Sequence, residues 1–509
     1  MYHLAMTKKT SSFDLVVRER QPGTVLFQWV YNEVRSAILD GRLGRGMRLP
    51  STRELARIYA VSRGTVVTAF EQLHAEGYLE GNVGAGTYVN TLLPEDFLQA
   101  KRDAGPVDEA KKLPPSLSQY AQRLGDAADT RSQPARAFRA AEPALDEFPI
   151  TLWSQIASRR LRGATRALLA DVDPRGYRPL REAISDYLGT ARGVRCTTDQ
   201  VIIVAGIQQG LDLTAHLLLD PGDPVWVEDP CFFLVTAMLK AFAAKIIPVP
   251  VDMNGLNVDE GQRRCDRAKL AYVTPAHQFP LGVTMTLDRR LALMEWARRT
   301  GGSIFEDDYD SEYRYSGRPI PALQGLDQSD SVIFAGSFSK VLFPSLRLGY
   351  LVVPAGLIDK FAAARYIMDR HSAVIDQAIL CDFITEGHFG RHIRRMRELY
   401  ASRLAVLRES VQRKLGELLT IPETEAGVNT VGWLANGLNA EAVAQAAAEC
   451  NVEVIPINRF ALEEQTPEGL LLGFGAVDDR ELLRGVEALT AALERCARKR
   501  HRAVGIAGV

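Results

Sequence analysis

A lysine and an aspartate at the ends of two strand-like segments are the first candidates for chemistry in this sequence. Asp307 follows the segment GSIFE, and Lys340 follows SVIFAGSFS, 33 residues later by subtraction. One strand-helix-strand unit is about that long, so both side chains could reach one edge of a single sheet. Most pairs of this kind are simple ion pairs, so other residues must decide between the two interpretations.

Groups that can bind a phosphate surround this lysine. Ser337 and Ser339 precede Lys340, and Arg347 lies seven residues after it. The segment GIQQG at residues 206–210 joins a strand-like block to a helical one, and the free amides at the start of such a helix can hold a phosphate. Together these residues indicate a phosphorylated aldehyde as ligand.

A phosphorylated aldehyde gives three residues distinct roles. Lys340 would form a Schiff base with it, and Asp307 would keep its pyridine nitrogen protonated. Tyr309, two residues after Asp307, could donate a hydrogen bond to its phenolic oxygen.

The elements that must position these groups are five short β-rich blocks separated by helical stretches. This pattern predicts a largely parallel sheet in an α/β fold, with ligands at the carboxyl ends of the strands. The blocks are QVIIVAG, PVWVED, KLAYVTP, GSIFEDD and SVIFAGS.

Residues 22–90 have a different pattern, which predicts three short helices and a hairpin. Ser51, followed by Glu54, can cap a second helix with apolar residues Leu55 and Ile58, and Ser62 can cap a third. The hairpin has a glycine-rich tip. Apolar residues at helical spacing mark the buried faces of the first and third helices: Val30, Val34 and Ile38, then Val66, Ala69, Phe70 and Leu73.

Positive charge accumulates in this N-terminal segment although the whole chain has a formal net charge of −1. The predicted architecture is a winged helix-turn-helix, whose third helix can enter the DNA major groove. An arginine-rich surface on a small interaction domain is the alternative. Between Tyr31 and Thr65, seven arginines (35, 42, 45, 48, 53, 57 and 63) face three acids (Glu33, Asp40 and Glu54), an excess of four that favours phosphate contacts.

The segment LPSTRELARIYAVSRGTVVTAFEQLHAEGYLEGNVGAGTYV resembles the DNA-binding domain of the GntR family of bacterial regulators. The resemblance implies a double-stranded DNA operator as partner. It places Arg53 and Arg63 near the DNA backbone or base edges, with Thr65 nearby and Gly86 in the wing.

The rest of the chain resembles fold-type I aminotransferases, and more narrowly the MocR subgroup of GntR regulators. The motifs are DPRGYRPLREAISDYL, VAGIQQGLDL, VEDPCFF, TPAHQFPLG, EDDYDSEYRY and SFSKVLFPSLRLGY. The resemblance implies that Lys340 carries pyridoxal 5'-phosphate, with Asp307 at the pyridine nitrogen and Tyr309 at the ring oxygen. It assigns the phosphate to Ser337, Ser339, Arg347, Gln208 and Gln209.

Other site residues follow from the same resemblance. Phe232 would stack on the ring, and His277 or Gln278 would replace an asparagine that aminotransferases place at the ring oxygen. Arg459 is the candidate for an effector carboxylate, with a surface arginine as the alternative. Tyr177 would come from the partner subunit of a head-to-tail, domain-swapped homodimer. No metal site is expected.

The expected domain order is a DNA-binding domain at 22–90, a linker at 91–134 and an aminotransferase-like domain at 135–496. The linker prediction rests on its prolines and weak apolar periodicity. The six cysteines are scattered and the N-terminus lacks an apolar signal sequence, so we expect a cytoplasmic protein without a membrane partner.

Three functions fit these features. The first is a pyridoxal-phosphate-dependent transcriptional regulator that senses a small amino compound, or the cofactor itself. The second is a working aminotransferase with an appended DNA-binding domain. The third, a dimerisation scaffold without cofactor, fits the setting of Lys340 poorly. The first is preferred because a DNA-binding domain has no chemical purpose on a metabolic catalyst, although residual transamination stays open.

Overall fold

The computed structural model of the chain has two compact units, which divide after Ser116. Each unit is described by itself. The structure describes residues 23–82, 86–99, 116–124, 135–315, 321–435 and 437–506.

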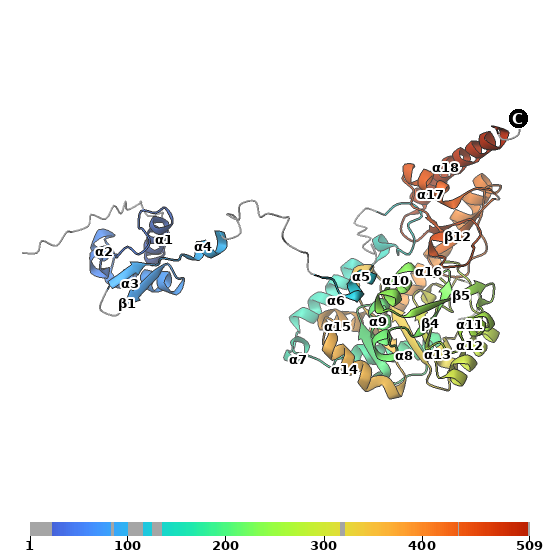
Figure 1. Cartoon of the computed structure of the whole chain (residues 1–509), viewed down its shortest axis with the longest axis horizontal. Coiled ribbons are helices and arrows are strands. Elements are labelled where there is room, and N and C mark those ends of the chain that lie inside the picture. Colours follow the sequence, from blue (N-terminus) through green and yellow to red (C-terminus); the bar gives the residue numbers. More distant parts are fainter. Residues whose placement is uncertain are drawn as a thin grey trace, which may run out of the picture. The chain divides into compact units, whose positions relative to one another are not determined.

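The small unit contains the predicted three helices and hairpin, together with one additional short helix (Figure 1). The hairpin is antiparallel, with Leu79 opposite Val89. Its tip, residues 83–85, lies outside the described residues. The elements are α1 (Leu26–Leu39), α2 (Thr52–Ile58), α3 (Arg63–Ala75), β1 (Leu79–Asn82), β2 (Gly86–Val89) and α4 (Pro94–Gln99).

The starts of α2 and α3 are capped by local side chains. The Ser51 hydroxyl accepts a hydrogen bond from the backbone N–H of Glu54 at the start of α2, and Ser62 does the same for Thr65 at the start of α3. The apolar stripes predicted for α1 and α3 are buried. On α2 only Leu55 is buried, whereas Ile58 is 41% exposed.

The start of the predicted linker is ordered against the small unit. On α4, Glu95 accepts hydrogen bonds from Arg35 at 3.0 Å and from the Tyr78 hydroxyl at 2.5 Å. Asp96 accepts two from Arg45, at 2.7 and 2.6 Å. Of the remaining linker, the structure describes residues 116–124, which include the short helix α5 (Gln119–Arg123).

The large unit is built on an eight-stranded sheet in the order β3-β10-β9-β8-β7-β4-β5-β6. Five neighbouring strands, β9, β8, β7, β4 and β5, run parallel, whereas β10 and β6 are antiparallel to their neighbours. All five predicted β blocks are strands of this sheet. Its strands are β3 (Val201–Val204), β4 (Pro224–Asp229), β5 (Lys245–Asp252), β6 (Gly255–Leu256), β7 (Leu270–Val273), β8 (Ser303–Asp308), β9 (Val332–Ser337) and β10 (Gly349–Val352).

Both faces of the central sheet are covered by helices. On β3, Val201 and Ile203 belong to one buried apolar cluster, while Ile202 and Val204 belong to another. Alternate strand residues point to opposite faces, so each face has its own core. The helices are α6 (Ile150–Arg162), α7 (Arg166–Leu169), α8 (Arg178–Arg192), α9 (Ile207–Leu218), α10 (Phe233–Phe242), α11 (Val258–Cys265), α12 (Leu287–Thr300), α13 (Leu323–Leu326), α14 (Ile358–Met368) and α15 (Val374–Thr385).

A second, antiparallel sheet in the order β11-β12-β14-β13 lies nearer the C-terminus of the chain. Its strands are β11 (Leu419–Thr420), β12 (Asn429–Leu434), β13 (Ile455–Pro456) and β14 (Gly469–Gly473). The accompanying helices are α16 (His388–Leu415), α17 (Ala440–Glu449) and α18 (Asp479–Ile506). In the described part of the chain, no helix is long and apolar enough to cross a membrane.

Candidate functional site

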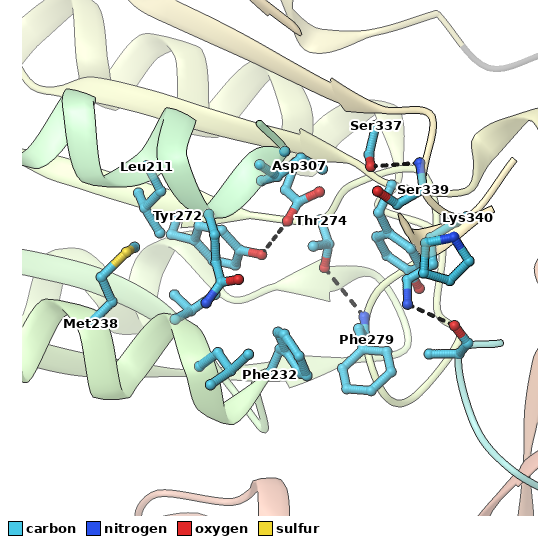
Figure 2. Close-up of a pocket in the computed structure, with 18 of the residues that line it drawn as sticks. Leu211, Phe232, Met238, Tyr272, Thr274, Phe279, Asp307, Ser337, Ser339 and Lys340 are labelled. Carbon is cyan, nitrogen blue, oxygen red and sulfur yellow. Dashed lines mark hydrogen bonds between the residues drawn. The ribbon is translucent and has the colours of Figure 1, made fainter. Parts of the chain in front are cut away.

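A cavity of about 290 Å³ lies where β8 and β9 end, beside the first turns of α9 and α10 (Figure 2). It forms at the carboxyl ends of parallel strands, where α/β sheets bind ligands. Eight of the residues predicted from the sequence line this cavity: Lys340, Asp307, Tyr309, Phe232, Gln208, Ser337, Ser339 and Arg347.

Asp307 is held in the cavity wall by one hydrogen bond. Its Oδ2 accepts from the Tyr272 hydroxyl of the neighbouring strand β7 at 2.5 Å. Its Oδ1 is buried and has no hydrogen-bond partner among the described residues. Burial raises the pKa of the Asp307 carboxyl from its ordinary value to about 7. Oδ1 is therefore an acceptor that a protonated ring nitrogen would satisfy.

Lys340 lies in the turn that follows β9. Its Nζ donates a hydrogen bond to the carbonyl oxygen of Ala141 at 2.6 Å. Burial lowers the pKa of the Lys340 ammonium. A lowered pKa favours the free amine, which is the form that attacks an aldehyde.

Donors suited to a phosphate gather at the junction of β3 with α9. Gly206 precedes α9 with φ +124°, and a Cβ there would lie 3.4 Å from a guanidinium nitrogen of Arg347. Arg347 itself adopts the left-handed conformation, with φ +48°. The Ser339 hydroxyl is buried and has no hydrogen-bond partner in the described part of the chain. A glycine here leaves room for the guanidinium beside the helix N-terminus.

Gln208 and Gln209 have different environments although they are adjacent. Gln208 lines the cavity. The Gln209 side chain lies elsewhere: its carbonyl accepts from the Ala205 N–H at 2.7 Å, and its amide donates to Asp369 at 2.9 Å. Gln209 therefore connects α9 to the end of α14.

Aromatic rings form the wall opposite Asp307. Phe232 immediately precedes α10, and its ring meets that of Phe279 edge to face, with centroids 5.4 Å apart. Figure 2 shows both rings on the side of the cavity facing Asp307 and Thr274.

Besides Gln209, four residues predicted for this site do not line the cavity. His277 lies behind Tyr309, and its Nδ1 is 3.1 Å from the Tyr309 hydroxyl. Tyr177 precedes α8, where its ring packs against the apolar core. Arg459 is exposed and pairs with Glu441 at 2.6 Å, so its predicted contact with an effector carboxylate stays a prediction. Gln278, the alternative to His277, donates to the carbonyl of Pro230 at 2.9 Å.

Several lining residues were not predicted from the sequence, among them Tyr272, Thr274 and Ala141. Tyr272 and Thr274 belong to the block KLAYVTP, and a tyrosine in an otherwise apolar strand was the available signal. Thr274 accepts from the Phe279 N–H at 3.3 Å. Ala141 lies far from the cavity in sequence, and nothing in its surroundings indicated a contact with Lys340.

The lining side chains fit the phosphorylated pyridine aldehyde that the sequence implied. An unpartnered carboxylate oxygen is available for a protonated ring nitrogen, and a buried amine for an aldehyde. An unpartnered hydroxyl and an arginine are available for a phosphate. Among the described residues, no group of three or more histidine, cysteine, aspartate or glutamate side chains could hold a metal ion.

The small unit carries a second candidate site. Arg53 and Arg63 are exposed at the starts of α2 and α3, and the Arg63 guanidinium donates to the Thr52 hydroxyl at 3.3 Å. The Thr65 hydroxyl lies 2.8 Å from that of Ser62. Gly86, the first residue of β2, has φ +107° and lies against Arg48. A Cβ at Gly86 would lie 2.8 Å from the Arg48 guanidinium.

Ion pairs divide the seven arginines in the described part of this unit into two sets. Arg35, Arg42 and Arg45 pair with Glu95, Asp40 and Asp96. The other four make no ion pair within the described part of the unit, and they are Arg48, Arg53, Arg57 and Arg63. The net positive charge of the described residues therefore belongs mainly to α2, the start of α3 and the segment before α2, where Arg48 forms an isolated β-bridge with Tyr88.

Comparisons with known proteins match both units. Residues 26–89 match the family of bacterial regulatory proteins called the gntR family, and residues 141–489 match aminotransferase class I and II. The probable rhizopine catabolism regulatory protein MocR of Rhizobium meliloti is 38% identical over 479 residues, covering 94% of this chain and 96% of that protein.

Two further similarities are informative. The pyridoxine biosynthesis transcriptional regulator PdxR of Corynebacterium glutamicum is 30% identical, over 88% of this chain and 92% of its own length. The crystal structure of LysN, an alpha-aminoadipate aminotransferase of Thermus thermophilus complexed with N-(5'-phosphopyridoxyl)-L-leucine, matches with a TM-score of 0.68 and 26% identity. That match covers 75% of this chain and 98% of LysN.

Proposed function

This chain is a transcriptional regulator of the MocR subgroup within the GntR family, with pyridoxal phosphate as its cofactor, and we propose that it senses a small amino compound at that cofactor. The amine, or the cofactor itself, would change how the small units engage a DNA operator. The observation that carries the proposal is the cavity in which Lys340 and the unpartnered Oδ1 of Asp307 occur together.

We assign each part of the cofactor to side chains that line the cavity. Lys340 binds the cofactor, Asp307 accepts from its ring nitrogen, and Tyr309 faces its ring oxygen. Phe232 covers one face of the ring. The phosphate is assigned to Ser337, Ser339, Arg347, Gln208 and the start of α9. When bound, the cofactor supplies an aldehyde carbon that exchanges the lysine amine for the amine of an effector.

We propose that effector binding is coupled to DNA binding through a difference in binding free energy. An effector can shift the regulator only if it binds one arrangement of the molecule better than another. A head-to-tail homodimer would bring Tyr177 of one subunit to the other subunit's cavity and would set the spacing of two DNA half-sites. We propose that this assembly acts in the cytoplasm.

A working aminotransferase is the competing function, and the relatives named as regulators do not favour it. The two functions differ in turnover. A sensor changes its visible absorbance with an amine and releases no keto acid, whereas an enzyme releases keto acid continuously.

The test compares Lys340→Ala with Lys360→Ala, an exposed lysine on α14. We expect Lys340→Ala to lose the visible absorbance of the bound cofactor and to keep operator binding within a few fold. Lys360→Ala should keep both. Retained absorbance in Lys340→Ala would contradict the assigned lysine, and sustained keto acid production by the unaltered protein would establish an enzyme.

A further inference from the structure

Two consecutive buried contacts, which join three residues, lead away from the cavity behind Tyr309. The Tyr309 hydroxyl lies 3.1 Å from Nδ1 of His277. The same Nδ1 lies 3.0 Å from Oδ2 and 3.2 Å from Oδ1 of Asp310. His277 is 5% exposed and Asp310 is 1% exposed, so solvent does not compete for these contacts.

One ring nitrogen therefore faces both a carboxylate and a phenol. An ionised carboxylate accepts hydrogen bonds and donates none, so the Asp310 carboxylate requires the hydrogen to be on Nδ1. Nε2 is buried without a partner among the described residues, and a second ring proton would bury an unpaired N–H there. The neutral ring protonated at Nδ1 is the state that satisfies this arrangement.

This protonation state decides where the Tyr309 proton points. With Nδ1–H directed at Asp310, Tyr309 can only accept from His277 and cannot donate to it. Tyr309 lines the cavity, so its own O–H is left to face the cavity interior.

The position of the imidazole is fixed from a third element. Gly427, just before β12, packs directly on the ring, and a Cβ there would lie 2.2 Å from its Cε1. Gly427 has φ +86°, and its N–H donates to the Tyr313 carbonyl at 2.9 Å. The ring therefore has little freedom to turn away from Asp310.

We propose that His277 and Asp310 are positioning residues, which hold the Tyr309 hydroxyl as a hydrogen-bond donor into the cavity. The inference rests on the proposed function, because the oxygen that receives this bond is the ring oxygen of the cofactor. It gives His277 an indirect role in place of the direct contact expected from the sequence.

The surroundings of Tyr309 support the donor role. Burial raises the pKa of Tyr309 well above its ordinary value, and nearby carboxylates raise it further, which keeps its proton in place. The acidic groups that contribute to this shift are Asp310, Asp307, Glu228 and Asp308. A hydrogen bond from this phenol stabilises the anionic form of the ring oxygen, so it lowers the pH at which the cofactor absorbance changes.

The experiment measures the midpoint of the absorbance change with pH in the cofactor-loaded full chain. Tyr309→Phe removes the donor and should raise the midpoint by about one to two pH units, the size of one hydrogen bond to a charged group. His277→Leu should raise it in the same direction. Combining His277→Leu with Tyr309→Phe should add nothing, because His277 acts through Tyr309.

Two more variants separate positioning from packing. His277→Asn, whose amide can replace the Nδ1 donor, should keep the midpoint of the unaltered protein. Asp310→Ala should raise it, because Tyr309 can then donate to Nδ1. Urea unfolding followed by tryptophan fluorescence confirms that each variant is folded.

Two results would overturn the inference. One is an unchanged midpoint in His277→Leu in a protein with a normal absorbance band, and the other is a shift that adds fully to that of Tyr309→Phe. Absence of any band in the unaltered protein would overturn the proposed function itself, and the inference with it.

Discussion

One carboxylate oxygen of Asp307 accepts a hydrogen bond, whereas the other has no partner among the described residues. This difference predicts the effect of a substitution on cofactor binding. The bond from Tyr272 holds the carboxylate in place while Oδ1 stays available. Asp307→Asn should weaken pyridoxal phosphate binding by roughly 10- to 100-fold, the size of a charge-assisted hydrogen bond. Titration of the cofactor-free full chain with pyridoxal phosphate measures this change.

The matched control for that titration is Arg459→Gln, which lies in the same unit but outside the cavity. It should leave cofactor affinity unchanged. Equal affinities of Asp307→Asn and the unaltered protein would remove Asp307 from the cofactor site.

Buried carboxyl groups of the large unit also predict how stability depends on pH. Burial raises the pKa of Asp307, Glu228, Glu306 and Glu312 to about 7 in the folded chain. The unfolded chain releases these protons near pH 4, so the folded state binds more protons between about pH 4 and pH 7. The cofactor-free protein should therefore lose stability as pH rises through that window.

Urea unfolding followed by tryptophan fluorescence at pH 5 and pH 7.5 checks this slope. Asp307→Asn should reduce the loss of stability between the two pH values, because one of the four groups no longer titrates. A stability that rises over this range in the cofactor-free protein would contradict the assigned pKa shifts.

At the level of elements, the sequence predicted the features that depend on residues close together in the chain. Ser51 and Ser62 mark helix starts through local hydrogen bonds, and the five β blocks are visible as apolar runs. The contacts of Lys340 with Ala141, and of His277 with Gly427, join segments more than a hundred residues apart. No local pattern encodes such contacts, which is why the contact of Ala141 with Lys340 and that of Gly427 with His277 were not predicted.

Gly206 lies in the loop between β3 and α9. Comparing it with Gly222 separates the effect of backbone strain from the effect of a methyl group placed beside Arg347. Gly206 has φ +124° and faces Arg347, while Gly222 has φ +98° and faces open space. Alanine at either position should destabilise the chain by about 1–3 kcal/mol, because an L residue is strained there.

The two substitutions should differ in cofactor binding. Gly206→Ala places a methyl group against the Arg347 guanidinium and should weaken pyridoxal phosphate binding several fold more than Gly222→Ala does. Titration of both variants, with unfolding measured in parallel, checks the difference. Equal affinities in the two variants would separate Gly206 from the phosphate site.

At the scale of the whole molecule, the two units should respond separately to substitutions at their own sites. Within the described part of the small unit, the positive charge that no acidic side chain balances lies on Arg48, Arg53, Arg57 and Arg63, whereas Arg45 pairs with Asp96 on α4. DNA affinity falls with salt in proportion to the number of phosphates that a protein neutralises. The sequence composition alone did not distinguish these two sets of arginines, because the acids on α4 lie in the predicted linker.

Arg63→Ala should therefore weaken operator binding and reduce the slope of log affinity against log salt by about one. Arg45→Ala, the matched control, should change that slope less, because its guanidinium is already paired with Asp96. Both variants should keep the cofactor absorbance of the unaltered protein. Fluorescence anisotropy with an operator fragment at several salt concentrations measures the slopes, and equal slopes for Arg63→Ala and the unaltered protein would mean that Arg63 contacts no phosphate.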